Sequence, residues 1–241
     1  MSITNIPEII VPGKRLGRHV DDRVALHRAA GGPPPMAPAI VSVTHASSGL
    51  PLNQGDTGSC TAHALGGALN TVPHWHKGNP TVGEPLVYDI YSREEQALGF
   101  GVYPPNDDGG SGMAVCEAAI ELKVCCDYQS TTDVDEALRA LVIRPVITGI
   151  NWYTSMDNPS PSGLVDIAPD ATVRGGHEIC AIAIDTPNEL VWFVNSWGTS
   201  YGVAHGDIPG GCFCMAFSTW ETLLGQQGDV TVPRTSQGWK A

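Results

Sequence analysis

The stretch Gly58-Ser59-Cys60-Thr61-Ala62-His63 decides how this chain is interpreted, because it places a thiol at the predicted start of a helix. Apolar residues recur at helical spacing after Cys60, and Ser59 is a favourable N-cap residue. Thiol chemistry needs the thiolate, and a free cysteine with a pKa of about 8.5 is mostly protonated at neutral pH. The aligned peptide dipoles of a helix N-terminus favour that negative charge. The sequence therefore predicts a reactive cysteine at position 60.

Two later segments supply the groups that a nucleophilic thiol needs. His177 lies at the start of a run typical of a buried strand, and Asn195 follows the next apolar run. A histidine across a cleft can take the thiol proton, and a side-chain amide can orient the imidazole without becoming charged. Trp197 is expected to pack over this contact and exclude water, which strengthens it. His177 follows Cys60 by 117 residues and Asn195 follows it by 135.

Gln54 lies six residues before the cysteine. Attack on a carbonyl puts negative charge on its oxygen, and preorganised N–H donors stabilise that charge. We expect the Gln54 side-chain amide and the backbone N–H of Cys60 to act as these donors.

The ordered set resembles the papain-like cysteine peptidases over about residues 36–232. Gln54 stands where the family has its oxyanion glutamine, and Gly58-Ser59-Cys60 resembles its nucleophile motif. Gly176-His177 and Asn195-Ser196-Trp197-Gly198 resemble the motifs of the base and of the residue that orients it. Gly109 and Gly110 resemble the glycine segment that lines the substrate cleft.

This resemblance implies an α+β, two-lobe fold. A helical N-terminal lobe (about 54–130) would face a C-terminal lobe of antiparallel sheet or barrel (about 140–235), with the active-site cleft between them. It implies thiol-dependent hydrolysis of peptide bonds in a peptide or protein substrate, without metal or cofactor. Asp107-Asp108 resembles a calcium ligand pair but lacks the fuller loop spacing.

Some positions depart from the plant and lysosomal enzymes. Thr57 stands where they have a disulfide cysteine, and Thr61 stands where they have tryptophan after the nucleophile. Both departures resemble the bacterial and bacteriophage branch. So do Leu16-Gly17-Arg18-His19-Val20, Tyr103-Pro104-Pro105 and Gln227-Gly228-Asp229-Val230.

The periodicity predicts helices first and strands later. Helices are expected over 60–69, 85–98 and 112–123, from about 133, and over 218–224; strands are expected over 40–43, 145–152, 177–185, 190–196, 211–217 and 229–232. We divide the chain into a basic N-terminal arm, residues 1–35, and a peptidase domain, residues 36–241. In the arm, residues 14–29 are expected to form a short helix that Gly31-Gly32-Pro33-Pro34-Pro35 ends.

Composition limits the partners. The net charge of −12 argues against nucleic acid. Seven cysteines at irregular spacing do not form a secreted disulfide framework, and Cys116 and Cys180 are expected to be buried free thiols. No signal peptide and no membrane span are recognised, so synthesis in a cytoplasm is expected.

Several interpretations stay open. The arm carries five basic and three acidic residues, so it is a candidate for self-contacts, for contacts with virion proteins, or for a brief strap over the cleft. The chain is alternatively a structural component of a phage particle that keeps the fold, or a hydrolase of cell-wall peptides. Glu178 either faces the cleft and favours a basic substrate side chain, or is an ion-paired or surface carboxylate.

Overall fold

An antiparallel sheet forms the centre of the computed structural model, which describes residues 3–4, 8, 11–24 and 38–235. Its long strand β6 (Val173–Asp185) pairs with β5 on one side and β7 on the other, and β3 (Val43–Thr44) adds to it. The remaining order across the sheet is β4 (Asp127–Thr131), β10 (Asp229–Arg234), β5 (Val146–Tyr153), β6, β7 (Leu190–Val194), β9 (Ile208–Ala216) and β8 (Val203–His205).

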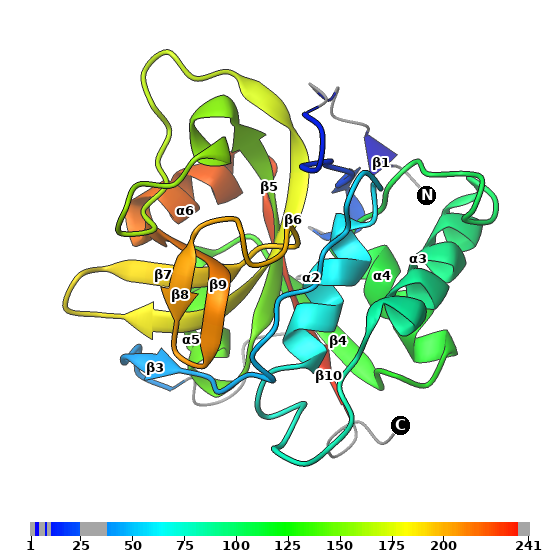
Figure 1. The fold of residues 1–241 in the computed structure, drawn as a ribbon, viewed down its shortest axis with the longest axis horizontal. Coiled ribbons are helices and arrows are strands. Elements are labelled where there is room, and N and C mark those ends of the chain that lie inside the picture. The colour runs from blue at the N-terminus through cyan, green and yellow to red at the C-terminus, as the bar shows by residue number, and fades with distance from the viewer. Residues whose placement is uncertain (1–2, 5–7, 9–10, 25–37, 236–241) are drawn as a thin grey trace.

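The helices form two groups around this sheet (Figure 1). On one side lie α2 (Cys60–Leu69), α3 (Glu84–Leu98) and α4 (Gly112–Glu121), and α2 packs directly on β6. The second group consists of α5 (Val134–Ile143), the short 3-10 helix η1 (Thr154–Asp157) and α6 (Phe217–Gly225). In this group α5 packs on β6, and α6 packs on β9 and β5. None of the helices in the described part of the chain has the length and apolar character needed to cross a bilayer.

Two hydrophobic clusters hold these groups together. One joins α2, α3 and α4 to one face of the sheet through residues such as Leu65, Ile90 and Ile182. The other joins α5 and α6 to the sheet through Trp152, Phe213 and Trp220, among others. The predicted mixture of helices and antiparallel sheet is confirmed, and the two clusters are consistent with the two-lobe layout.

The main elements begin and end within a few residues of their predicted bounds, with some differences. The strands β4 and β8 were not predicted, and the strand expected over 40–43 is limited to β3. Ser59 occupies the N-cap position of α2, but its side chain does not cap the helix. The Ser59 hydroxyl instead hydrogen-bonds Thr57 Oγ1 and His63 Nδ1.

The helix predicted over residues 14–29 is wrong for its first part. Residues 14–19 are not helical, and β2 (Val20–Asp21) pairs with β1 (Ile3–Thr4). The backbone groups of this segment bond to distant parts of the chain, which replaces the local hydrogen bonds of a helix. Residues 25–29 and the predicted terminator at 31–35 lie outside the described residues.

Acid is expected to destabilise the fold through the buried His74. Burial, with the charge of Arg144, lowers the pKa of His74 to about 4. The unfolded chain takes up this proton below about pH 6.5, whereas the folded chain resists until about pH 4. The contribution of His74 to the free energy of unfolding is therefore fully present above pH 6.5. It decreases as the pH falls toward 4, by up to ~3 kcal/mol.

We expect His74→Gln to flatten the fall in the free energy of unfolding between pH 6.5 and 4, measured by urea titration. The matched control is His76→Gln, because His76 is exposed. Equal pH slopes for both variants would contradict the assignment.

Candidate active site

Cys60 is the first residue of α2 and is fully buried. Burial raises the pKa of its thiol well above the usual range, although a hydrogen bond from the backbone of Glu178 favours the thiolate. The helix start was expected to lower this pKa, and in this structure desolvation outweighs it. The thiol thus lies against β6, beside the residue that follows His177.

His177 lies in β6 and is also fully buried. Its Nε2 is 2.8 Å from Asn195 Oδ1, and its ring stacks on Trp197 with 4.9 Å between centroids and 21° between planes. The Trp152 ring contacts the His177 ring edge to face, with 5.0 Å between the ring centroids. Burial lowers the pKa of His177 to about 3, and nearby Arg174 adds to this, whereas the Asn195 contact opposes it. The second ring nitrogen, Nδ1, is buried without a hydrogen-bond partner among the described residues.

Asn195 is held in place by its backbone. Its N–H donates to Gly211 O at 2.9 Å, and its Oδ1 accepts a second hydrogen bond from the Ser196 N–H at 2.8 Å. Because Oδ1 already accepts from Ser196, the side-chain oxygen is fixed toward the imidazole. This arrangement selects the tautomer of His177 that carries its proton on Nε2.

Gln54 connects the nucleophile segment to the Asn195 loop. Its backbone N–H donates to Ser196 O at 2.9 Å, and its side-chain oxygen accepts from the Ser196 hydroxyl. Its Nε2 donates to Thr57 O at 2.7 Å. An amide nitrogen carries two hydrogens, so one remains for another acceptor.

The glycine segment is supported by carboxylates that the sequence analysis missed. Glu95 Oε1 accepts from the N–H groups of Asp108 and Gly109, and Glu94 Oε1 accepts from Ser111 N. Asp107 Oδ1 accepts from Gly58 N at 2.7 Å, which ties this segment to the nucleophile loop. A signal was present: Glu94 continues the apolar helix face of Val87 and Ile90, where a carboxylate needs partners.

The N-terminal arm runs across this site. The N–H groups of Gly17 and Arg18 reach Gly176 O at 3.2 and 3.0 Å. On the other side, Gly110 N donates to Gly17 O at 2.8 Å, and His19 N donates to Gly110 O at 2.6 Å. The arm therefore forms backbone hydrogen bonds with the glycine segment and with the residue before His177 at the same time.

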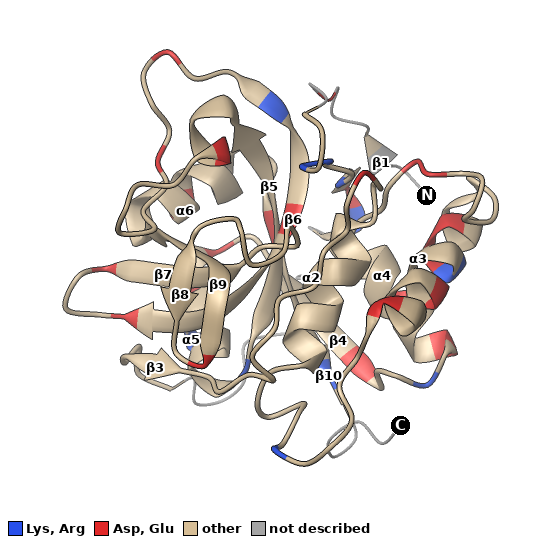
Figure 2. Cartoon of the chain, in the orientation of Figure 1, with Lys and Arg blue, Asp and Glu red and all other residues tan. Residues whose placement is uncertain are grey.

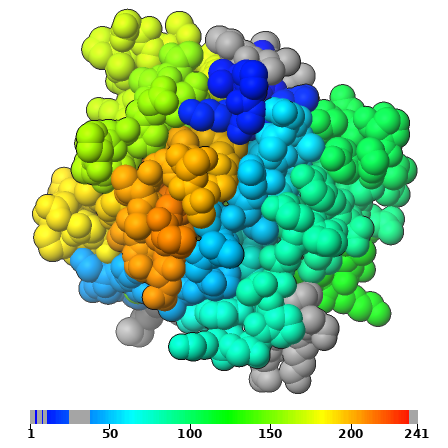
Figure 3. All heavy atoms as spheres, viewed as in Figure 1, coloured from blue at the N-terminus to red at the C-terminus, as the bar shows by residue number. Residues whose placement is uncertain are grey.

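Figure 3 shows the dark-blue arm at the surface, between the cyan segment and the yellow-green and orange segments of later residues. Side chains anchor it: Leu16 is buried in the second cluster, and Arg23 pairs with Asp21 and Glu117. The helix α3 beside it carries several acidic positions (Figure 2).

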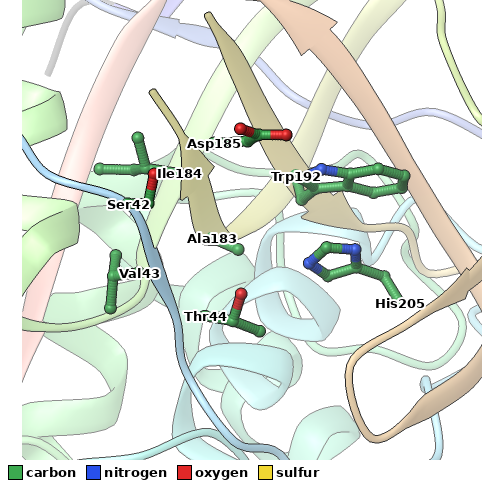
Figure 4. A pocket seen from close by; sticks show the side chains of 8 residues that line it. All are labelled: Ser42, Val43, Thr44, Ala183, Ile184, Asp185, Trp192 and His205. Carbon is green, nitrogen blue, oxygen red and sulfur yellow. The ribbon is translucent and has the colours of Figure 1, made fainter. Parts of the chain in front are cut away.

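A separate hollow of about 300 Å³ lies on the strands away from these residues. Trp192 and His205 stack within it at 4.1 Å between centroids (Figure 4). Neither Cys60 nor His177 lines it, so it is distinct from the site above. No cluster of three or more histidine, cysteine or acidic residues suited to a metal occurs in the described ranges.

Solved structures of cysteine proteases share this fold. Xylellain, a cysteine protease from Xylella fastidiosa, is 18% identical with a TM-score of 0.65, over 97% of this chain and 96% of that chain. Bromelain from Ananas comosus is 16% identical with a TM-score of 0.56, over 79% and 95%. Procathepsin L 3 from Tenebrio molitor is 14% identical with a TM-score of 0.57, over 85% and 71%. No family model matches the sequence, and no curated protein matches it. The fold is that of papain-like cysteine proteases.

Proposed function

We propose that this chain is a thiol-dependent peptide hydrolase with Cys60 as its nucleophile. The observation that carries the proposal is the His177 Nε2–Asn195 Oδ1 contact of 2.8 Å, next to a residue whose backbone bonds the Cys60 thiol. The contact leaves Nδ1 of His177 to exchange protons. The cysteine protease fold supports the same reaction class.

The first half of the reaction forms an acyl-enzyme. The thiol gives its proton to His177 Nδ1, and Cys60 Sγ bonds to the carbonyl carbon of the substrate. The negative charge on the carbonyl oxygen is received by the free N–H at the start of α2 and by the remaining Gln54 N–H. His177 then passes its proton to the leaving amine as the C–N bond breaks.

Water completes the cycle. His177 takes a proton from water as its oxygen bonds to the acyl carbon, and the C–S bond breaks to restore the thiol. Throughout, Asn195 holds the imidazole, and Trp197 and Trp152 keep bulk water from the ring. These roles use side chains and one backbone N–H of this chain, together with a peptide and a water molecule.

The resting chain is proposed to be closed by its own arm. Residues 17–19 occupy backbone hydrogen bonds on both sides of the site, and Cys60 has no exposed surface. A substrate would need the same space, so the arm must leave before catalysis. The described arm residues pack on their own chain, and a virion role, the phage branch and cell-wall peptides as substrates stay predictions.

Labelling with an iodoacetamide reagent tests the nucleophile. All seven cysteines are described, and Cys126 alone is exposed, so the measurement uses Cys126→Ala. After proteolytic trimming of the arm, mass spectrometry is expected to find the adduct at Cys60, with little in the untrimmed chain. His177→Ala should slow labelling of the trimmed protein by ~10²-fold, because the proton acceptor is lost. Equal labelling of Cys60 and buried Cys180 would refute the proposal.

A further inference from the structure

The arm inserts a buried arginine into an acidic pocket beside the candidate active site. The Arg18 side chain has no exposed surface, and its Nη2 pairs with the carboxylate of Asp229. The same nitrogen donates to Gln227 O at 2.7 Å. Burying a guanidinium is costly unless the pocket is built to receive it.

The pocket is a row of three residues across adjacent strands. Asp229 on β10 is paired with Gly149 on β5, and Gly149 is paired with Glu178 on β6. Side chains of directly paired residues point to the same face of a sheet. The row therefore places one carboxylate on each side of a position that has no side chain.

Glycine at the centre makes the room for the guanidinium. A Cβ on Gly149 would collide with Arg18 Nε and would lie 2.7 Å from Glu178 Oε2. From α4, Gly112 closes the pocket: a Cβ there would lie 2.9 Å from Glu178 Oε1 and 3.3 Å from Asp229 Oδ1. Glu178, Asp229 and Arg18 thus converge on the space left by two glycines.

The pocket has more acceptors than Arg18 uses. Both carboxylate oxygens of Glu178 and Oδ1 of Asp229 are buried without a hydrogen-bond partner within the described ranges. Burial raises the pKa of both carboxyls. Two buried carboxyls must either carry protons or be paired with a cation, and a guanidinium in the closed pocket lets them stay ionised.

A guanidinium fits better than an ammonium. It has five N–H donors in one plane, which can reach carboxylates on two sides. In the resting chain Nη2 of Arg18 bonds Asp229 and Gln227 O, and its Nε and Nη1 have no hydrogen-bond partner among the described residues. The pocket also lies close to the nucleophile, because the backbone of Glu178 bonds the Cys60 thiol. The Glu178 side chain points to the face of β6 opposite that of His177. A side chain held here comes from a residue close to the bond that is cut.

We propose that the Glu178–Asp229 pocket selects an arginine side chain of the peptide substrate, and that Arg18 occupies this pocket in the resting chain. This inference rests on the proposed peptidase function and names its substrate class. When the arm leaves, the backbone of a substrate takes over the hydrogen bonds to Gly110 and Gly176. The substrate's arginine then supplies the cation that the two carboxylates need.

The test uses the full-length Arg18→Ala chain, in which the pocket is free and the arm has lost one of its anchors. A fluorogenic peptide library that varies each position near the scissile bond is assayed for kcat/KM. We expect one position to prefer arginine over glutamine by at least ~10-fold, which corresponds to about 1.4 kcal/mol. Adding Glu178→Gln and Asp229→Asn should bring the ratio of kcat/KM for arginine and glutamine peptides close to one.

Two further variants sharpen the result. Gly149→Ala in the same background should lower the ratio of kcat/KM for arginine peptides to that for peptides with alanine at the same position. Glu221→Gln, an exposed carboxylate on α6, should change nothing. Cleavage without any arginine preference in Arg18→Ala would overturn the inference and make the pocket an anchor for the arm only. Absence of both cleavage and Cys60 labelling would instead refute the peptidase function itself.

Discussion

Replacing Cys60 by alanine is expected to abolish peptide hydrolysis, lowering kcat/KM of the arm-trimmed protein by at least ~10⁴-fold. The covalent route needs a sulfur that bonds to the carbonyl carbon, and alanine offers no atom that can do so. Binding and the oxyanion donors would remain, so the residual rate would reflect these alone. Initial rates on a cleaved peptide measure the effect.

A second buried cysteine provides the control. Cys180 lies in β6 and is 1% exposed, so Cys180→Ala removes a similar volume from the interior. We expect it to keep its activity and to lose only stability. Full activity in Cys60→Ala, with its thermal unfolding close to that of the parent chain, would exclude Cys60 as the nucleophile.

Replacing Gly17 by alanine is expected to open the site in the full-length chain and to raise the rate of Cys60 labelling by at least ~10-fold, or about 1.4 kcal/mol. A Cβ on Gly17 would overlap the carbonyl of Gly58, and backbone atoms cannot rotate away. Gly17 does not have a positive φ, so alanine suits its backbone conformation. The expected loss is therefore confined to the docking of the arm.

The matched control for this variant is Gly225→Ala. Gly225 ends α6, and a Cβ there would meet no atom within 4 Å. Labelling of Gly17→Ala and Gly225→Ala is compared with the parent by mass spectrometry, in the Cys126→Ala background. Unchanged labelling in Gly17→Ala would show that the arm does not control access to Cys60.

The sequence predicted the elements and residues that depend on local signals. Cys60 before an amphipathic helix, and Asn195 after an apolar run, are recognisable from their neighbours alone. The structure places Asn195 Oδ1 within hydrogen-bond distance of His177 Nε2, as the order of the motifs suggested. The short strands β4 and β8 were not predicted because neither shows a strong alternation of apolar residues.

Contacts between distant segments could not be predicted. The arm has a helical pattern in isolation, yet residues 17–19 are fixed by Gly110 and Gly176, some 90 and 160 residues away. Glu178 was considered either a cleft residue or an ion-paired one, and its neighbour Arg18 comes from the arm. The row of Asp229, Gly149 and Glu178 depends on strand register, which periodicity does not reveal.

The covalent link between the arm and the site has a kinetic consequence. A tethered segment meets its own site at an effective concentration that reaches the millimolar range for short flexible connections, however dilute the protein is. Closing is therefore a first-order event, and dilution of the protein does not activate the chain. Substrate at micromolar concentration competes poorly with such a neighbour. Hydrolysis by the intact chain should therefore be slow at every protein concentration, and cutting the arm away should raise its rate.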